Sequence, residues 1–228
     1  MTEQRIARRV AILATAREMI AEVGYEDITV RDLAQRCRVS VPTLYNQFGG
    51  KDELLAEAIQ EHFVGMLGGA SLALGDPGFS TFINVLDDCS KQFLTLPAYH
   101  QRLLEAFASL DATASVQRRI AAEFSGVIAE QLLHLQRQRQ LADWADGQLL
   151  TGQVTSAVIG TAIVWSRGHL SDEALGPGIR YAAGLVVLGA ARGRTREELE
   201  TLVIEAQAAL PKAVFTKDEN EFQLIQKV

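Results

Sequence analysis

Cysteine is scarce in this chain of 228 residues, which contains only Cys37 and Cys89. Two cysteines without a secretory leader do not make a disulfide framework, the device of small secreted domains. Residues 1–24 are basic, but charged side chains interrupt their apolar positions, so this segment does not fit a signal peptide. No stretch reaches the roughly 18 consecutive apolar residues of a membrane span. We therefore expect a cytoplasmic protein without a membrane partner.

The sequence patterns of common enzyme sites are also missing. The chain has no H-E-x-x-H, G-x-S-x-G, P-loop, C-x-x-C or G-x-G-x-x-G pattern. His100, His134 and His169 have no carboxylate or thiol at metal-ligand spacing, and Cys89 has no basic neighbour in sequence to activate its thiol. We therefore expect a protein that is not an enzyme and that needs no metal or cofactor.

Positive charge is in the minority, because 22 Lys and Arg stand against 28 Asp and Glu, for a net charge of −6. The acidic excess is unevenly distributed. Residues 1–51 hold eight basic and six acidic residues, a balance of +2, which leaves fourteen basic and twenty-two acidic residues, a balance of −8, for residues 52–228. A nucleic-acid partner needs only one basic face, so the N-terminal segment can serve DNA binding.

Apolar residues recur at helical spacing almost from end to end, and alternating strand patterns are scarce. The spacing predicts an all-α protein. A turn is expected over 171–178 (SDEALGPG), and a capping box T-x-x-E at Thr195 is expected to open a last helix that Pro211 ends. The longer helices are predicted over about 3–23, 51–73, 78–96, 98–111, 113–141, 148–167, 178–191 and 195–210.

Two short helices are predicted between residues 29 and 48. Thr29 opens the first as T-x-x-D, and Ser40 caps the second, with Pro42 in its first turn, where a missing N–H costs little. A tight turn at 38–39 joins them, which is the pattern of a helix-turn-helix. The residues predicted to pack between these helices are Leu33, Ala34, Cys37, Val39, Leu44 and Phe48.

The outer side of the second short helix carries uncharged polar groups and methyl groups. Short groups of this kind suit base edges, whereas Tyr45 and Asn46 suit phosphate oxygens. Gly49 and Gly50 then let the chain reverse, so that Lys51 lies at the N-terminus of the next helix. There its charge and the unpaired backbone N–H groups can together hold a phosphate.

Taken together, this string resembles the N-terminal domain of the TetR family of bacterial transcriptional regulators. The resemblance covers residues 5–60, roughly a quarter of the chain, and beyond them the chain is similar only in its helices and its length. It implies a helix-turn-helix domain over 1–50, an effector-binding and dimerisation domain over 51–211, and a tail over 212–228 that is docked or disordered. The matching residues are Gly24, Tyr25, Thr29–Ala34, Val39, Ser40, Thr43–Tyr45, Phe48, Lys51, Leu54 and Leu55.

The resemblance also implies which residues bind DNA. They are Arg31, Ser40, Val41, Pro42, Thr43, Tyr45, Asn46, Gln47 and Lys51. Within this set, residues 41–43 face the groove, residues 45–47 and Lys51 face the phosphate backbone, and Arg31 lies near a base or a phosphate. One departure is Arg38, at a turn position where the family often has glycine. A positive φ there would cost about 1 kcal/mol, so we expect either a looser turn or an added phosphate contact from Arg38.

A helix-turn-helix monomer covers only one half-site, so a twofold dimer on a palindromic operator is expected. The predicted helices over 148–167 and 178–191 are apolar on more than one face, and small residues are frequent in both. They are the candidates for the dimer interface, which the resemblance also places in two late helices. The alternative is that the monomer itself buries them.

For the small-molecule effector that the resemblance implies, the sequence offers only scattered large side chains on the middle helices. Packing in the core is the alternative for each of them. The candidates are Met66, Phe93, His100, Leu104, Phe107, Phe124, Trp144 and Trp165. Most are apolar, so we expect a largely apolar effector.

The leading hypothesis is a ligand-responsive, homodimeric DNA-binding regulator, most simply a repressor that its effector releases from the operator. The alternative is an all-α enzyme or small-molecule-binding protein that does not bind DNA. A helical adaptor for other proteins is a third possibility, against which Lys51 beside an exposed Thr43 and Tyr45 favours DNA.

Overall fold

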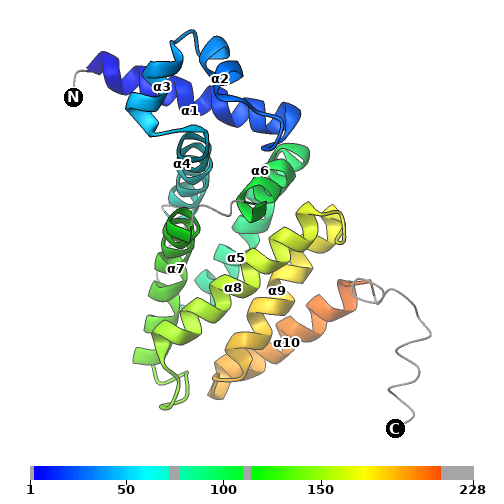
Figure 1. The fold of residues 1–228 in the computed structure, drawn as a ribbon. Coiled ribbons are helices and arrows are strands. Elements are labelled where there is room, and N and C mark those ends of the chain that lie inside the picture. The colour runs from blue at the N-terminus through cyan, green and yellow to red at the C-terminus, as the bar shows by residue number, and fades with distance from the viewer. Residues whose placement is uncertain (1–2, 72–77, 110–113, 212–228) are drawn as a thin grey trace. The chain divides into compact units, whose positions relative to one another are not determined.

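The computed structural model describes residues 3–71, 78–109 and 114–211, and within these ranges it is built of helices (Figure 1). The all-α prediction is confirmed there, and an isolated antiparallel bridge between Leu141 and Ala191 is the β-type contact in the described ranges. The helices are α1 (Glu3–Val23), α2 (Val30–Arg36), α3 (Val41–Phe48), α4 (Lys51–Ser71), α5 (Phe79–Leu94), α6 (Pro97–Ser109), α7 (Ala114–Arg137), α8 (Gly147–Ser166), α9 (Asp172–Leu188) and α10 (Gly193–Ala209).

The chain divides into two compact units. Unit 1 comprises Met1–Ala73 and Thr95–Phe124, and unit 2 comprises Leu74–Leu94 and Ser125–Val228. Helices α4 and α6 belong with the helix-turn-helix in this division, because both pack against α1. The functional boundary expected at residue 50 concerns DNA and effector binding, and it stays a prediction.

The core of unit 1 lies between α1, α4 and α6. Apolar residues at helical spacing meet there, and on the outer side two ion pairs join α1 to α4, Arg9 with Glu57 and Arg17 with Glu61. The main buried side chains are Ile12, Leu13, Ala16 and Ile20 of α1, Leu54, Leu55, Ile59 and Phe63 of α4, and Leu103, Leu104 and Ala106 of α6.

Helix α9 is the centre of unit 2, since it packs against α5, α8 and α10. Ala183 and Val187 of α9 are completely buried. At Gly184 a Cβ atom would lie 2.9 Å from a methyl carbon of Val203, so α10 can approach this closely only because the residue is glycine. Arg180 of α9 donates two hydrogen bonds of 2.5 Å to the carboxylate of Asp87, which ties α9 to α5.

Both short helices of the helix-turn-helix begin where the sequence indicates. Thr29 and Asp32 form a reciprocal capping box at the start of α2. At the start of α3 the hydroxyl of Ser40 accepts a hydrogen bond from the backbone N–H of Thr43, and Pro42 lies in the first turn. Of the residues predicted to pack between the two helices, Leu33, Ala34, Leu44 and Phe48 are buried, and Cys37 and Val39 are half-buried.

The predicted turn over 171–178 is wrong, because α9 already begins at Asp172 and runs through Pro177. Proline at this position removes the hydrogen bond to the carbonyl of Glu173, four residues earlier. Packing outweighs that loss, since Leu175, Gly178 and Ile179 are all buried and a Cβ on Gly178 would lie 3.1 Å from both Leu170 and Thr161.

The capping box predicted at Thr195 is also wrong. Helix α10 begins two residues earlier, at Gly193, and no side-chain hydrogen bond caps it. The Thr195 side chain is fully buried and donates instead to Oε1 of Gln140, while Glu198 pairs with Arg194. A T-x-x-E pattern therefore does not distinguish a helix start from a buried threonine in the first turn. The other long helices begin and end within about one turn of their predicted bounds.

Three helices end in the same left-handed turn, two of them with arginine at the left-handed residue. Arg38 has φ 54° and Arg139 has φ 57°, where α8 has Gly168 with φ 73°. In each turn the backbone N–H of the following residue donates a hydrogen bond to the carbonyl five residues earlier. The N–H of Val39, for example, donates to the carbonyl of Ala34 at 2.9 Å. The turn at Arg38 is thus as tight as one made with glycine, and the looser turn considered from the sequence does not occur.

Replacing Arg38 by glycine should raise the free energy of unfolding by about 0.5–1 kcal/mol. Relief of the left-handed strain gives about 1–2 kcal/mol, and the greater freedom of glycine in the unfolded chain removes about 0.5–1 kcal/mol of it. Denaturant titration of Arg38→Gly and Arg139→Gly measures the gain. Arg38→Ala keeps the strain and is the control, so equal stability of the glycine and alanine variants would contradict this account.

Candidate functional site

Helix α3 is two turns long and is held at both ends. Its hydroxyl cap is reinforced by a contact of 2.7 Å between the Oγ atoms of Ser40 and Thr43, and it stops at Gly49, whose φ is 98°. Leu44 and Phe48 are its buried side chains. The rest of this helix is available on the surface of unit 1, where Figure 1 shows it beside α1 and α2.

The structure brings most of the predicted DNA-binding residues together on α3. Pro42, Tyr45 and Asn46 are exposed and share one face of the helix by their three- and four-residue spacing, with the Tyr45 ring 51% exposed. The half-buried members are Val41, Thr43 and Gln47. Arg31 on α2 and the Ser40 cap are exposed. Helix α3 carries no charged side chain, so nothing on it repels a phosphate.

Lys51, at the first residue of α4, is held by partners that the sequence analysis did not identify. Its ammonium lies 4.9 Å from the centroid of the Tyr25 ring and donates to the carbonyl oxygen of Glu26 at 3.4 Å. The Tyr25 hydroxyl in turn donates to Asp52 at 2.6 Å. Burial and this hydrogen bond raise the pKa of Tyr25 above its usual value. The result is a fixed cation at the helix N-terminus.

Gln47 differs from the other predicted phosphate ligands. Its Oε1 atom is buried and, among the described residues, has no hydrogen-bond partner. Its backbone carbonyl accepts a hydrogen bond of 3.0 Å from Arg9, a residue of α1 that sequence reasoning did not connect with the site. Its inward-facing amide oxygen sets it apart from the exposed Asn46.

His100, predicted to line an effector pocket, is buried in unit 1 and forms a pair with His62 of α4. The two Nε2 atoms are 3.1 Å apart, so one ring donates and the other accepts. Burial, together with the charges of His100 and Arg17, lowers the pKa of His62 to about 4. The His62 ring is therefore neutral near pH 7. This contact could not be predicted from the sequence, since the two residues are far apart along the chain.

The remaining effector candidates whose side chains the structure describes are divided between the two units. Phe93 and Trp165 are buried against each other in unit 2, with ring centroids 5.9 Å apart, whereas Leu104 is buried in unit 1. Trp144 is 74% exposed. The side chains of Met66, Phe107 and Phe124 lie outside the described part of the structure. These assignments stay predictions.

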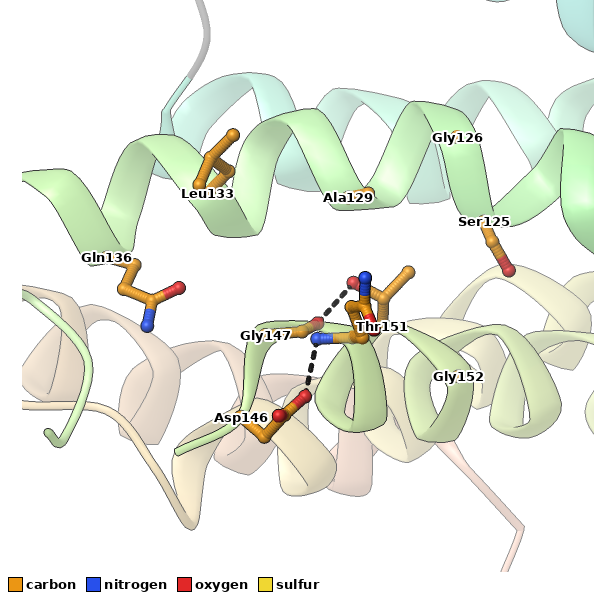
Figure 2. A pocket seen from close by; sticks show the side chains of 10 residues that line it. Ser125, Gly126, Ala129, Leu133, Gln136, Asp146, Gly147, Thr151 and Gly152 are labelled. Carbon is orange, nitrogen blue, oxygen red and sulfur yellow. Dashed lines mark hydrogen bonds between the residues drawn. The ribbon is translucent and has the colours of Figure 1, made fainter. Parts of the chain in front are cut away.

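Unit 2 contains a half-open pocket of about 600 Å³ between α7 and α8 (Figure 2). Its lining includes three glycines and an alanine, and a Cβ added at Gly126 or Gly152 would meet no atom within 4 Å. Its polar groups include Thr151, which donates to the carbonyl of Gly147, and Asp146, which caps α8. The lining residues are Ser125, Gly126, Ala129, Leu133, Gln136, Asp146, Gly147, Gln148, Thr151 and Gly152. These residues could not be predicted from the sequence, because small residues give no signal of a cavity.

Neither cysteine is in a reactive environment. Burial raises the pKa of the Cys89 thiol to about 12, and burial also raises the pKa of Cys37. In the described ranges no three His, Cys, Asp or Glu side chains come together in a group that could hold a metal ion.

Comparison with known proteins identifies the N-terminal part of the chain. Residues 12–58 match the model of a family described as bacterial regulatory proteins, tetR family. No curated protein matches the sequence. The matched segment runs from the middle of α1 into α4 and includes the whole helix-turn-helix.

Several solved structures have a similar fold. FadR of Thermus thermophilus, a TetR-family transcriptional repressor in complex with lauroyl-CoA, has a TM-score of 0.63 at 18% identity and covers 81% of this chain and 96% of its own. RolR in complex with resorcinol has a TM-score of 0.62 at 17% identity, and the match covers 93% of this chain and 99% of RolR. A TetR transcriptional regulator from Rhodococcus sp. RHA1 has a TM-score of 0.62 at 20% identity, and the match covers 81% of this chain and 97% of that regulator.

At these identities the similar structures indicate the fold alone, and the family match indicates the helix-turn-helix. The family is one of regulatory proteins rather than enzymes, as the missing catalytic patterns predict. The helix-turn-helix segment over residues 12–58 thus matches the tetR family of bacterial regulatory proteins, and the chain has the fold of solved TetR-family regulators.

Proposed function

We propose that this protein is a cytoplasmic, homodimeric repressor that binds a palindromic operator through α3 and leaves it when a small, largely apolar molecule binds. The observation that carries the proposal is the geometry of α3. It is a capped two-turn helix without charge that exposes Pro42, Tyr45 and Asn46, with the fixed ammonium of Lys51 just beyond its C-terminal end. Only the first turns of such a helix enter a major groove.

The dimer is supported by the surface of α8. This helix has no charged residue and, by length and composition alone, is long and apolar enough to cross a membrane, yet only 39% of its apolar window is buried. Gly152, Ser156 and Gly160 are exposed at four-residue steps, beside Leu149, which is 73% exposed. A second copy of the helix would cover this face. Ala183 of α9, by contrast, is already buried in the monomer.

The pocket between α7 and α8 is the proposed effector site. Its walls are mostly apolar, and its polar groups offer carbonyl, carboxylate and hydroxyl oxygens, which accept hydrogen bonds. These features suit a neutral, largely apolar molecule that carries a hydroxyl or another donor at one end. Two of the similar structures, FadR and RolR, were solved with a small molecule bound.

Three substitutions should separate positioning on DNA from reading of its sequence. Lys51→Ala removes a phosphate contact, so it should weaken binding to all duplexes and lower the salt slope by about one contact. Tyr45→Phe should cause a smaller loss that is also independent of sequence. Thr43→Ala should cost about 1–3 kcal/mol on the operator and little on random DNA.

Affinities are to be measured at two salt concentrations on a duplex that the wild-type protein selects from a random library and on an unselected duplex. Thr43→Ser keeps the hydroxyl bonded to Ser40 and shows whether methyl or hydroxyl is read. Equal losses on both duplexes for Thr43→Ala would mean that α3 does not read the groove. If the wild-type protein selects no duplex, the proposed function is wrong.

An arginine in the middle of the exposed α8 face should break the dimer, because it would place an unpaired charge in the interface. We expect Ser156→Arg to be folded and monomeric in sedimentation equilibrium. Thr201→Arg on α10 is the matched control, since Thr201 is also exposed and also donates to the carbonyl four residues earlier. A dimer that survives Ser156→Arg would place the interface elsewhere.

Filling the pocket between α7 and α8 should abolish the response to the effector while leaving DNA binding intact. Ala129→Leu adds three carbons to the lining, and we expect at least about a tenfold loss in the potency of a releasing compound. The compound is to be chosen from a panel of neutral aromatic and aliphatic alcohols by its release of wild-type protein from the operator. Ala208→Leu, at an exposed position of α10, is the control. Unchanged release from Ala129→Leu would rule out this pocket.

A further inference from the structure

Arg9 of α1 contacts both α3 and α4. Its Nε atom donates to Oε1 of Glu57 at 3.0 Å, and Nη2 lies 2.5 Å from each carboxylate oxygen of Glu57. Nη1 donates to the backbone carbonyl of Gln47 at 3.0 Å. The guanidinium plane also lies over the ring of Phe48, 4.4 Å from its centroid. One side chain therefore joins three helices of unit 1.

These contacts fall on the C-terminal end of α3. The last carbonyls of a helix have no partner within it and carry a partial negative charge, so a cation there is stabilising. The carbonyl of Gln47 is such a group. The buried side chains that hold α3 are Leu44 and Phe48, and Arg9 covers the second of them.

The arrangement requires arginine rather than a generic cation. A planar guanidinium presents five donors in a fixed fork, which allows a two-oxygen contact with Glu57, a separate bond to Gln47 and stacking on Phe48 together. A lysine ammonium is a compact charge that cannot make all four contacts. In this geometry Nε, Nη1 and Nη2 of Arg9 each have a partner, so the side chain is already engaged before any phosphate approaches.

We propose that Arg9 is a positioning residue for DNA binding, which fixes the angle between α3 and α4 and so the distance between the exposed face of α3 and the phosphate contact at Lys51. This inference rests on the proposed DNA binding. Arg9 acts through Glu57 and Gln47 and does not itself touch DNA. The intact protein is tested in the variants Arg9→Lys and Glu57→Gln, with Glu61→Gln as the control.

Glu61→Gln is a matched control because it makes the same change one turn further along α4. Glu61 also forms an ion pair with α1, through Arg17 at 2.7 Å, and Arg17 donates in addition to the carbonyl of Ala58, so these contacts join α1 to α4 rather than to α3. We expect Arg9→Lys and Glu57→Gln to weaken operator binding about tenfold, the effect of one lost charge-assisted hydrogen bond. Glu61→Gln should leave the operator affinity within about twofold of wild type.

The sign of the effect at Glu57 separates positioning from long-range charge. Removing a carboxylate makes the DNA-binding unit more positive, so electrostatics alone would tighten binding to every duplex. If Glu57 acts by positioning α3, Glu57→Gln should instead weaken operator binding, with a salt slope equal to that of wild type. Tighter or unchanged operator binding by Glu57→Gln would overturn the proposal.

Hydrogen exchange gives a second measurement that does not need DNA. The amide of Gly49, which donates to the carbonyl of Tyr45 at 2.9 Å, should exchange faster in Arg9→Lys and Glu57→Gln than in wild type and Glu61→Gln. If wild-type protein fails to bind DNA, the proposed function is wrong and this exchange alone decides whether Arg9 holds α3. Wild-type exchange rates in both variants would overturn the positioning role.

Discussion

The DNA-binding unit depends on one constraint, which is that an eight-residue helix does not hold its own shape in water. Helix nucleation is unfavourable, and isolated helices of fewer than about 12 residues are marginal. Helix α3 therefore takes both its existence and its orientation from neighbours: the Ser40 hydroxyl at one end, Leu44 and Phe48 beneath, and Arg9 at the other end. The left-handed Arg38 belongs to the same constraint, because it fixes where the α3 cap begins.

Glycine residues have two different effects on the packing of unit 2, depending on which atoms lie next to them. At Gly184 the neighbour Val203 is so close that a Cβ would clash, so the missing side chain permits tight packing of α9 and α10. At Gly126 and Gly152 no atom comes within 4 Å of a Cβ, so the same kind of residue leaves a pocket and an uncovered face on α8. Composition alone does not distinguish these outcomes.

Local signals explain what could be predicted from the sequence. The capping box at Thr29, the Ser40 cap and the apolar spacing of α1 involve residues a few positions apart, and the structure confirms them. The failures involve distant partners. Pro177 is tolerated because α9 is packed on several sides, and His62 meets His100 from another helix. The exposed residues of α3 could be predicted, whereas the contacts of Lys51 with Tyr25 and of Arg9 with Gln47 could not.

The pocket that we propose for the effector is formed by residues of unit 2. Helix α7 supplies Ser125, Gly126, Ala129, Leu133 and Gln136 to that pocket, and its first part, to Phe124, belongs to unit 1. A ligand shifts a conformational equilibrium only by its difference in affinity for the two states. A ligand that binds one arrangement of α7 better than another therefore acts on unit 1 through a continuous helix, without needing a contact of its own there.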